Sequence, residues 1–297
     1  MNVLEARLPL ARARRFPDFL DLTKPRITLL ILVTALLGFY LGAGRALTLA
    51  ALPLLLGTAL ISSGTSGLNQ YLERDVDSRM SRTANRPLPS GRLRPAEALV
   101  FSLLLSLLGW VVLAVLVNAL TGALAAATTL VYAFVYTPLK RVTSLAILVG
   151  AVPGALPAVG GWAAATGRID TGAMVLFTIV FLWQLPHFLA IAWLYQEDYR
   201  RGGLWILPGF RHDGQGLARW VVFYNTALLP VSLLPVMVGM GGRLYLVGSL
   251  VLGLAFLATG LQFARTRSRF CARRHLLASV VYLPLLWGLL VIDQVGP

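Results

Sequence analysis

The most concentrated chemistry in this chain begins at Asn69, directly after an apolar run. If that run continues as a helix, Asn69, Glu73 and Asp77 recur at intervals of four, so an amide and two carboxylates share one helix face. Such oxygen ligands suit Mg²⁺, which commonly bridges carboxylates to substrate phosphates. Arg82 and Arg86 follow, and guanidinium groups grip phosphate oxygens in pairs. A loop between membrane helices is also polar simply because water surrounds it, but the spacing and the adjoining arginines favour a binding site.

A second group of polar side chains, Tyr136, Lys140 and Arg141, ends the fourth apolar run. The tyrosine could be an interfacial anchor and the basic residues could be topology charges. If they face the first polar segment instead, Lys140 and Arg141 would bind a diphosphate, and Tyr136 would hydrogen-bond it or shield a carbocation with its ring. The sequence supports these alternatives about equally. Lys24 and Arg26 precede the first apolar run, where snorkelling to lipid headgroups accounts for them without a partner.

The sixth apolar run contains a further candidate site, because Gln184, Pro186 and His187 interrupt it. Polar groups inside a membrane span are costly unless they face a cavity or a partner, so His187 is a functional candidate. A histidine that is satisfied by a neighbouring helix is the alternative. Pro186 should kink the helix and free a backbone carbonyl. Glu197 and Asp198 then return two acids to the same side, where they could complete a second metal site opposite the first.

The composition is that of an integral membrane protein. Of the 297 residues, 57% are hydrophobic and 13% are charged, and the mean hydropathy is +0.75, too apolar for a soluble domain. The net charge of +14 does not indicate nucleic-acid binding, because the basic residues lie in short blocks between apolar runs, as topology signals do. Cys271 is the single cysteine, so neither an internal disulfide nor a cysteine-based metal site can form. His212 and His275 lie in arginine-rich stretches and are interpreted as solvated loop residues.

Nine apolar runs come close to the length of about 20 residues that a spanning helix needs. Their predicted bounds are residues 27–43, 47–69, 96–117, 120–136, 144–164, 171–195, 220–240, 244–263 and 276–292. This layout puts all of the 26 basic residues except Arg45, Arg168 and Arg243 on one side. Because positive loops stay in the cytoplasm, we expect the N-terminus and the two longest polar loops, residues 74–95 and 196–219, to be cytoplasmic.

The predicted fold class is all-α, a polytopic bundle of transmembrane helices. Lipid-embedded backbone must satisfy its own hydrogen bonds, and the apolar runs lack the alternation of β-barrel strands. We expect a single intramembrane domain over residues 1–297, in which residues 1–22 form a cytoplasmic N-terminal segment. That segment lacks the uninterrupted apolar core of a signal peptide, and its acids weaken a transit-peptide interpretation. A bacterial inner membrane is the expected location.

The arrangement of acids and bases indicates a reaction class. Two acidic clusters on one face, each surrounded by bases, suit a metal-bound diphosphate, which is a good leaving group. An apolar membrane cavity can hold a long isoprenoid tail and shield an allylic cation from early capture by water. The layout therefore favours prenyl transfer between two lipophilic substrates.

With these residues identified, the chain resembles the UbiA-type intramembrane prenyltransferase superfamily over essentially its whole length. The usual first motif there is Asn-Asp-x-x-Asp-x-x-x-Asp, and here it reads Asn69-Gln70-x-x-Glu73-x-x-x-Asp77. These departures resemble the protohaem IX farnesyltransferase (haem O synthase) family, as do Arg82-Thr-Ala-Asn85-Arg86-Pro87, Tyr136-Thr-Pro-Leu-Lys140-Arg141 and Trp183-Gln-Leu-Pro-His187-Phe188. The second Asp-x-x-x-Asp motif of the quinone enzymes is absent, and Tyr195-Gln-Glu197-Asp198-Tyr199 takes its place.

The resemblance implies a particular reaction. A farnesyl group would pass from farnesyl diphosphate to a vinyl group of haem b (protohaem IX), with addition of water, to give haem O and diphosphate. Mg²⁺ would be the cofactor, with Asn69, Glu73 and Asp77 as its ligands and Glu197 or Asp198 on the opposite side.

The resemblance also assigns roles to the remaining candidates. Tyr136 would help to steady the allylic cation, and His187 would contact the haem iron or a propionate, or position water. The candidate diphosphate contacts are Lys24, Arg26, Arg82, Arg86, Lys140 and Arg141. The implied partners are farnesyl diphosphate, haem b and the lipid bilayer, with no nucleic acid. A haem A synthase or terminal-oxidase assembly proteins are further candidates from the pathway.

Three other functions fit the sequence less well. The same reaction with an aromatic or quinone-precursor acceptor is disfavoured by Gln70, Glu73 and the Trp-Gln-Leu-Pro-His segment. A transporter of anionic lipophiles is the alternative of another class, but the acids gather at one face rather than near the midplane. An assembly factor that merely holds haem would need no metal cluster. We expect Asp77, at a wet edge, to tolerate replacement by Asn without unfolding but with loss of turnover.

Overall fold

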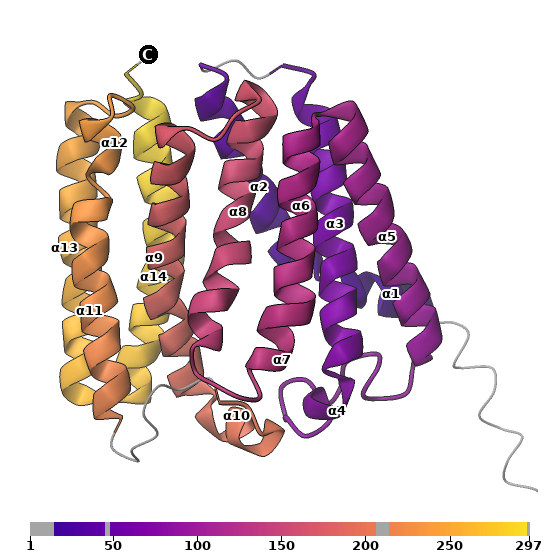
Figure 1. Ribbon diagram of the computed structural model, residues 1–297. Coiled ribbons are helices and arrows are strands. Elements are labelled where there is room, and N and C mark those ends of the chain that lie inside the picture. Colours follow the sequence, from indigo (N-terminus) through magenta and orange to yellow (C-terminus); the bar gives the residue numbers. More distant parts are fainter. Residues whose placement is uncertain (1–14, 45–47, 206–213, 296–297) are drawn as a thin grey trace, which may run out of the picture.

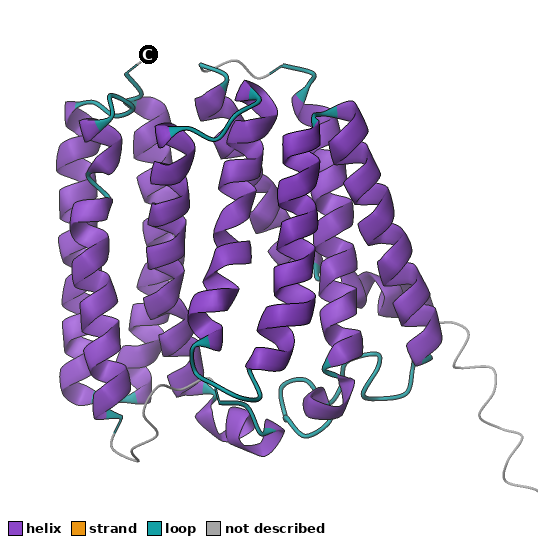
Figure 2. Ribbon diagram, viewed as in Figure 1, coloured by secondary structure: helices purple, strands orange, loops and turns teal. Residues whose placement is uncertain are grey.

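The computed structural model describes residues 15–44, 48–205 and 214–295. Regular structure in these ranges is helical throughout, apart from an isolated β-bridge between Gly241 and Gln294 (Figure 2). Nine helical stretches within them are long and apolar enough to cross a membrane. The all-α fold class and the nine predicted spans are thereby confirmed for the described part of the chain. Residues 1–14 of the predicted N-terminal segment and His212 lie outside it.

The candidate spans follow one another along the chain with short connections. They are α2 (Pro25–Gly42), α3 (Ala51–Leu72), α5 (Pro95–Leu116), α6 (Ala119–Leu130) with its π-helical continuation η1 (Val131–Tyr136) and α7 (Thr137–Leu139), α8 (Ala146–Thr166), α9 (Thr171–Leu194), α11 (Gln215–Val231) with α12 (Leu234–Met237), α13 (Arg243–Thr266) and α14 (Arg269–Ile292). Large apolar side chains such as Leu29, Leu104 and Val251 are exposed on them. That exposure is expected where lipid rather than water surrounds a bundle.

Most of the short helices gather at one end of the bundle, whereas α12 lies at the other end (Figure 1). α4 (Arg74–Asp77) follows α3, and α10 (Gln196–Gly202) follows α9. Figure 1 shows α4, α7 and α10 along the lower edge of the molecule. A further short helix, α1 (Arg15–Thr23), precedes α2 and packs against α3. The two polar segments predicted from the sequence therefore meet at the same end of the bundle. A hydrogen bond between Ser81 and Asp198, for example, joins residues that are 117 positions apart in the sequence.

The spanning helices form two groups. α3 packs against α5 and α2 against α8, while α13 packs against α14 and α11 against both α9 and α13. α9 contacts α8 and so joins the groups, as Figure 1 shows near the middle of the bundle. The backbones of α2 and α8 pack in direct contact. A Cβ atom at Gly38 would overlap the Ala158 carbonyl, and one at Gly161 would overlap the Ala35 carbonyl. Small residues commonly allow such close packing between membrane helices.

α14 begins earlier than the sequence indicates, and this changes the interpretation of His275. The predicted span starts at residue 276, whereas the helix starts at Arg269. Cys271, His275 and Ser279 lie one turn apart and are all buried, while Arg273 and Arg274 are exposed on the other side. His275 is 0% exposed, so its interpretation as a solvated loop residue is wrong. The basic residues that indicated a loop occupy only the outer face of a helix.

Candidate active site

A polar pocket of 550 Å³ lies at the end of the bundle where the short helices gather. Its walls come from α1 to α4, the loop after α4, η1 and the α10 segment. The predicted site residues that line it are Lys24, Asn69, Glu73, Asp77, Arg82, Arg86, Tyr136 and Lys140, together with Asp21, Ile27, Gln70, Met80, Asn85, Pro87, Tyr132, Tyr199 and Leu204. Folding therefore brings most of the predicted residues into one cavity.

The predicted helical face of the first motif is present, although the helix changes at Glu73. α3 ends at Leu72, and Glu73 has φ −102° and ψ 6° before α4 begins. The Glu73 amide still donates to the Asn69 carbonyl at 3.0 Å, and the Asp77 amide donates to the Glu73 carbonyl at 2.7 Å. The helical hydrogen-bond pattern continues across the junction, which keeps the three side chains on one face.

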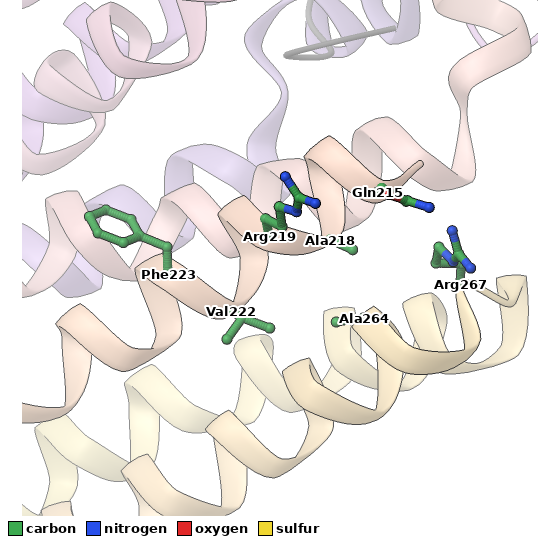
Figure 3. A pocket seen from close by; sticks show the side chains of 7 residues that line it. All are labelled: Gln215, Ala218, Arg219, Val222, Phe223, Ala264 and Arg267. Carbon is green, nitrogen blue, oxygen red and sulfur yellow. The ribbon is translucent and has the colours of Figure 1, made fainter. Parts of the chain in front are cut away.

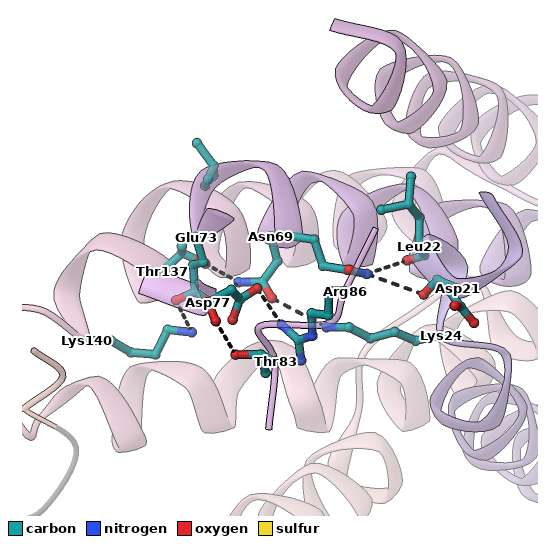
Figure 4. Close-up of polar contacts among 12 residues, drawn as sticks. Asp21, Leu22, Lys24, Asn69, Glu73, Asp77, Thr83, Arg86, Thr137 and Lys140 are labelled. Atoms are coloured by element: carbon teal, nitrogen blue, oxygen red, sulfur yellow. Dashed lines mark hydrogen bonds and ion pairs between the residues drawn. The ribbon is translucent and has the colours of Figure 1, made fainter. Parts of the chain in front are cut away.

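Each carboxylate of this face is paired with a base from another segment (Figure 4). Lys140 Nζ lies 2.5 Å from Glu73 Oε1, and Arg86 Nη1 lies 2.6 Å from Asp77 Oδ2. The loop after α4 also covers Asp77, whose carbonyl accepts from the Thr83 hydroxyl at 2.9 Å. The Asp77 side chain is 1% exposed, so the expectation of a wet edge is wrong. Buried charges are tolerated when they are paired in this way.

Asn69 links Glu73 of this face to Lys24 and to Thr137. Its Nδ2 donates to Glu73 Oε2 at 2.9 Å and to Thr137 Oγ1 at 3.1 Å, and its Oδ1 accepts from Lys24 Nζ at 3.4 Å. The Thr137 hydroxyl in turn donates to the Tyr132 carbonyl at 2.8 Å. Asn69 is 3% exposed, and both ends of its amide are engaged. These contacts fix the amide orientation, with the oxygen toward the ammonium group of Lys24.

Two aromatic rings of η1 form the inner wall of the pocket. The ring centres of Tyr132 and Tyr136 lie 5.2 Å apart, and Lys140 Nζ lies 4.6 Å from the centre of the Tyr136 ring. The Tyr136 ring packs directly against Gly150 of α8, where a Cβ atom would collide with it. Because the faces of aromatic rings attract cations, this wall is suited to a positive charge that develops beside it.

Glu197 and Asp198 are not brought into the pocket. Asp198 accepts hydrogen bonds from the backbone amides of Ser81 and Arg82, at 3.1 and 3.2 Å. Glu197 pairs with Arg200 at 2.8 Å, and hydrogen bonds from Arg200 lower the pKa of Glu197 to about 2. Asp198 therefore links the α10 segment to the loop after α4, whereas the contacts of Glu197 are with arginines of α10 itself. In this structure they do not face the first motif as the predicted second metal site requires.

The α10 segment instead contributes aromatic rings and a backbone link. The guanidinium carbon of Arg82 lies 5.0 Å from the ring centre of Tyr195 and 5.9 Å from that of Tyr199. Burial raises the pKa of the Tyr199 phenol, which therefore keeps its proton and can donate into the pocket. The Trp205 amide donates to the Lys140 carbonyl at 2.7 Å. The α10 segment thus connects the two loops that carry the bases.

Arg26 and Arg141 lie outside the pocket. Arg141 Nη2 lies 3.0 Å from Asp75 Oδ1, and its Nη1 donates to Oδ2 at 3.2 Å. Partial burial by itself raises the pKa of the Asp75 carboxyl, but the hydrogen bonds and the charge of Arg141 lower it overall. Arg26 is exposed. The sequence-based assignment of these two arginines as diphosphate contacts is not supported by their placement.

An apolar chamber of 330 Å³ continues from the pocket into the bundle. The two cavities share Ile27 and Tyr132 in their walls. α2, α3, α6, α8 and α9 supply most of the chamber's lining, with Leu54 toward the end remote from the pocket. Gln184 also lines the chamber, and its Nε2 donates to the Ala151 carbonyl of α8 at 2.7 Å. An apolar tail could therefore extend inward from a polar head group that is held in the pocket.

His187 lies beside α14 and lines neither cavity. Its Nδ1 lies 2.7 Å from Ser279 Oγ, and the Ser279 hydroxyl donates to the Leu276 carbonyl at 2.6 Å. Because a hydroxyl has one proton, Ser279 must accept from His187, so Nδ1 carries the imidazole proton and Nε2 keeps a lone pair. The Trp183 ring stacks on the imidazole at 5.3 Å between centres.

A third hollow, of 540 Å³, lies between α11 and α13 (Figure 3). Ala218, Val222, Phe223 and Ala264 give it an apolar floor, and Arg219 lies at its edge. None of the described residues that line it is acidic. It lies apart from the polar pocket and the chamber, and no sequence-predicted site residue contributes to it.

The residues of the polar pocket fit a Mg²⁺ ion that arrives with a diphosphate. Within the described ranges, no group of three or more His, Cys, Asp and Glu side chains could hold a metal by itself. Glu73, Asp77 and the amide oxygen of Asn69 nevertheless offer oxygen donors on one face, the donor type that Mg²⁺ prefers. Mg²⁺ commonly binds one or two carboxylates and completes its shell with substrate phosphates and water. The adjacent bases would offset the phosphate charge.

Sequence reasoning missed residues that line the pocket, and also Thr137, which contacts the pocket residue Asn69. Tyr132 precedes Tyr136 by one helical turn, so its place on the same wall could have been predicted from that spacing. Thr137 offered no comparable signal, because its contact with Asn69 joins positions that are 68 residues apart. Asp21 likewise enters the pocket only because α1 folds back against α3.

Comparison with known proteins identifies close relatives in sequence. The model of the UbiA prenyltransferase family matches residues 31–288. A protoheme IX farnesyltransferase of Solibacter usitatus is 49% identical over 289 residues, which cover 94% of this chain and 99% of the relative. A protein of the same name from Myxococcus xanthus is 45% identical over 290 residues, which cover 96% and 98%.

Solved structures share the fold at low sequence identity. A digeranylgeranylglyceryl phosphate synthase superposes with a TM-score of 0.79 at 16% identity and covers 94% of this chain and 98% of its own. A UbiA homologue of Aeropyrum pernix gives 0.72 at 19% identity, with 90% and 97% covered. A UbiA homologue of Archaeoglobus fulgidus bound to GPP and Mg²⁺ gives 0.64 at 15% identity, with 92% and 99% covered. At these identities the likeness establishes the fold.

Proposed function

The chain belongs to the UbiA prenyltransferase family, and within it we propose that it transfers a farnesyl group from farnesyl diphosphate to a vinyl group of protohaem IX, with addition of water, to give haem O and diphosphate. One observation carries this proposal. A polar pocket lined by paired acids and bases adjoins an apolar chamber, and Ile27 and Tyr132 line both cavities. The names of the Solibacter and Myxococcus relatives support haem as the acceptor.

The proposed roles of the pocket residues follow from their contacts. Lys24, Arg82, Arg86 and Lys140 would bind the diphosphate oxygens, since all four line the pocket. Asn69, Glu73 and Asp77 would hold Mg²⁺ against the diphosphate, and Mg²⁺ would supply charge stabilisation for the leaving group. Lys140 and Arg86, which neutralise the two carboxylates in this structure, could then turn their charges toward the diphosphate.

The proposed chemistry balances with water as the third reactant. The bond between farnesyl C1 and the diphosphate oxygen breaks, and both electrons leave with the diphosphate. C1 then bonds to the terminal vinyl carbon of haem, and the cation left on the neighbouring carbon takes up water and loses a proton. The rings of Tyr132 and Tyr136 would face the allylic cation. The chamber would hold the farnesyl tail away from water.

For His187 we propose a haem contact through Nε2. The bond to Ser279 fixes the tautomer, and a lone pair on Nε2 can bind iron or accept a hydrogen bond from water. It cannot donate to a propionate in this form. Between the roles open for this residue, the hydrogen bonds thus favour an iron contact or a water contact.

We further propose that the pocket end faces the cytoplasm of a bacterial inner membrane. The basic residues concentrate at that end, as the retention of positive loops predicts. Haem b and farnesyl diphosphate are the proposed substrates, and enzymes that act on the product, such as a haem A synthase, or oxidase assembly proteins are candidate partners. The orientation can be checked by labelling single cysteines placed in the α4 and α13–α14 connections of intact and broken cells.

A reconstituted assay tests the proposed reaction. Purified protein in detergent receives haem b and farnesyl diphosphate, with Mg²⁺ or with a chelator, and the haems are separated by chromatography. We expect a later-eluting haem whose mass corresponds to the addition of one farnesyl group and one water, and its loss on chelation. Diphosphate release with an aromatic acceptor but no haem product would overturn the haem assignment and retain the prenyltransferase. Product formation that is insensitive to chelation would overturn the metal assignment.

A further inference from the structure

Gln70 replaces an acid of the usual first motif with an amide, and its contacts use the amide protons. Its side chain is 1% exposed, and Nε2 donates to the Leu22 carbonyl at 3.1 Å and to the Asp21 carbonyl at 3.4 Å. Both acceptors lie in the last turn of α1. An ionised carboxylate could not make these bonds, because it only accepts and would be repelled by carbonyl oxygens. At this position the chain requires a donor.

The bonds from Gln70 complete the C-terminal end of α1. The last four carbonyls of a helix lack partners within the helix. The Leu20 carbonyl accepts from the Thr23 hydroxyl at 2.7 Å, and the Thr23 carbonyl accepts from the Thr28 hydroxyl at 3.0 Å. The two carbonyls between them accept from Gln70. Side chains of α1, α2 and α3 thereby fix the end of α1 against the rest of the bundle.

The residue that follows this end, Lys24, has an uncommon backbone conformation. Its φ of 47° and ψ of 61° lie in the left-handed region, which side-chain-bearing residues rarely adopt and which Pro25 makes less favourable still. The turn brings the Lys24 side chain into the pocket, where Nζ lies 3.4 Å from Asn69 Oδ1 (Figure 4). Such a conformation persists when the surrounding structure over-determines it.

We propose that Gln70 is a positioning residue for the diphosphate site: by fixing the end of α1 it imposes the left-handed turn at Lys24 and holds the Lys24 ammonium where a diphosphate oxygen binds. Adjacent residues of α3 thus act on the two ends of one lysine, Gln70 on its backbone turn and Asn69 on its ammonium group. This inference rests on the proposed function, which puts a diphosphate in the pocket. It also explains why an amide stands at position 70.

A double-mutant cycle tests whether Gln70 acts through Lys24. Gln70→Met keeps the length of the side chain and removes both hydrogen bonds without adding charge. Binding of inorganic diphosphate with Mg²⁺ is measured by titration calorimetry for the wild type, Gln70→Met, Lys24→Met and the double variant. We expect each single change to weaken binding by about tenfold, the size of one lost charge-assisted contact. The double variant should bind no more weakly than Lys24→Met alone, since residues that share one interaction are non-additive.

The outcomes separate positioning from general support of the fold. If Gln70→Met weakens diphosphate binding as much in the Lys24→Met background as in the wild type, the inference is overturned. Unchanged diphosphate binding by Gln70→Met would also overturn it. Gln262→Met serves as the control, because Gln262 is exposed on α13 and, among the described residues, its side chain bonds Arg274 alone. If Gln70→Met does not fold, Gln70→Leu removes the donor without adding charge, and its effect should also vanish in Lys24→Met.

Inorganic diphosphate keeps this test independent of the acceptor. Wild-type protein that binds it and shows the expected cycle, but forms no haem product, would refute the proposed acceptor and leave the role of Gln70 intact. Wild-type protein that fails to bind it would overturn the inference itself. If the protein forms haem O but the effects of Gln70→Met and Lys24→Met on diphosphate binding are additive, the proposed function is retained and the link between Gln70 and Lys24 is refuted.

Discussion

The two groups of helices bury polar residues in different ways. In the group that contains α2, α3 and α8, the polar residues around the pocket carry full charges in the Lys140–Glu73 and Arg86–Asp77 pairs, and all of these except Arg86 are buried. In the group of α9, α11, α13 and α14, the buried polar residues are neutral, and several bond one another, such as Ser232 with Tyr282 and Asn225 with His275. The first arrangement leaves charges that can exchange partners with an incoming anion. The second has no such charges, and within the described ranges it leaves the buried atoms Asn225 Oδ1 and Trp287 Nε1 without hydrogen-bond partners.

His275 is an example of a neutral polar residue that is fully buried in the second group of helices. Its Nδ1 lies 2.8 Å from Thr259 Oγ1, and the Thr259 hydroxyl donates to the Phe256 carbonyl at 2.7 Å. The Phe256 ring stacks on the imidazole at 4.7 Å between centres. His187 has the same kind of Nδ1 bond, to Ser279, but is only partly buried. Two histidines with similar partners thus differ in burial, since His275 is 0% exposed and His187 is only partly buried.

The largest expected effect is that of Asp77→Asn, which removes a charge from the pocket. We expect turnover to fall by about 100-fold or more, as losses of electrostatic stabilisation at a reacting centre typically do. Because Asp77 is buried and pairs with Arg86, the free energy of unfolding should also fall, by about 1–3 kcal/mol. Asp75→Asn is the control, since Asp75 is exposed two positions away and pairs outside the pocket. Turnover assays and thermal unfolding measure the two effects, and full activity of Asp77→Asn would contradict the metal role.

The next largest effect is expected for His187→Ala, and it differs in kind from that of His275→Ala. His187→Ala should lower haem product formation by at least about tenfold while leaving diphosphate binding unchanged, because His187 lies outside the pocket. His275→Ala should instead lower the free energy of unfolding by about 1–3 kcal/mol, because it removes the hydrogen bond to Thr259 and the ring that stacks on Phe256. Activity per folded molecule should be retained in His275→Ala. Reversed results for the two variants would remove the distinction between the helix groups.

A smaller effect is expected in the chamber, where Gly160 of α8 has open space. Gly160 lines the chamber, and a Cβ atom there would meet nothing within 4 Å. Gly160→Leu should fill the remote end and favour geranyl over farnesyl diphosphate by about tenfold in kcat/KM, the size expected when a pocket loses room for a few carbon atoms. Gly288→Leu is the matched control in α14, at a glycine with equally open surroundings. An unchanged preference in both variants would show that the tail does not reach Gly160.

The smallest effect is expected for Arg141→Gln, since this arginine pairs with Asp75 at the surface. Exposed pairs contribute about 0–1 kcal/mol, so KM for the prenyl diphosphate should change by no more than about twofold. Arg86→Gln, which alters a base inside the pocket, should raise that KM by about tenfold. Steady-state kinetics distinguish the two, and a large effect of Arg141→Gln would mean that its side chain leaves Asp75 when substrate binds.

Much of the fold could be predicted from the sequence because it depends on local composition. The nine spans follow from runs of apolar residues, and the helical face of Asn69, Glu73 and Asp77 follows from their spacing. The approximate bounds of α14 failed because a block of arginines was interpreted as a loop, whereas the helix buries Cys271 and exposes the arginines. Composition alone does not say which side of a helix a charge occupies.

The sequence by itself determined which chemical groups were available and that they would lie at one end of a membrane bundle. Only the tertiary structure decided which of them meet. It paired Lys140 with Glu73 and Arg86 with Asp77, joined the pocket to the chamber, and directed Asp198 and Arg141 to other partners. The physical reason is that these contacts join segments distant along the chain, and their geometry depends on how the helices pack rather than on any local pattern.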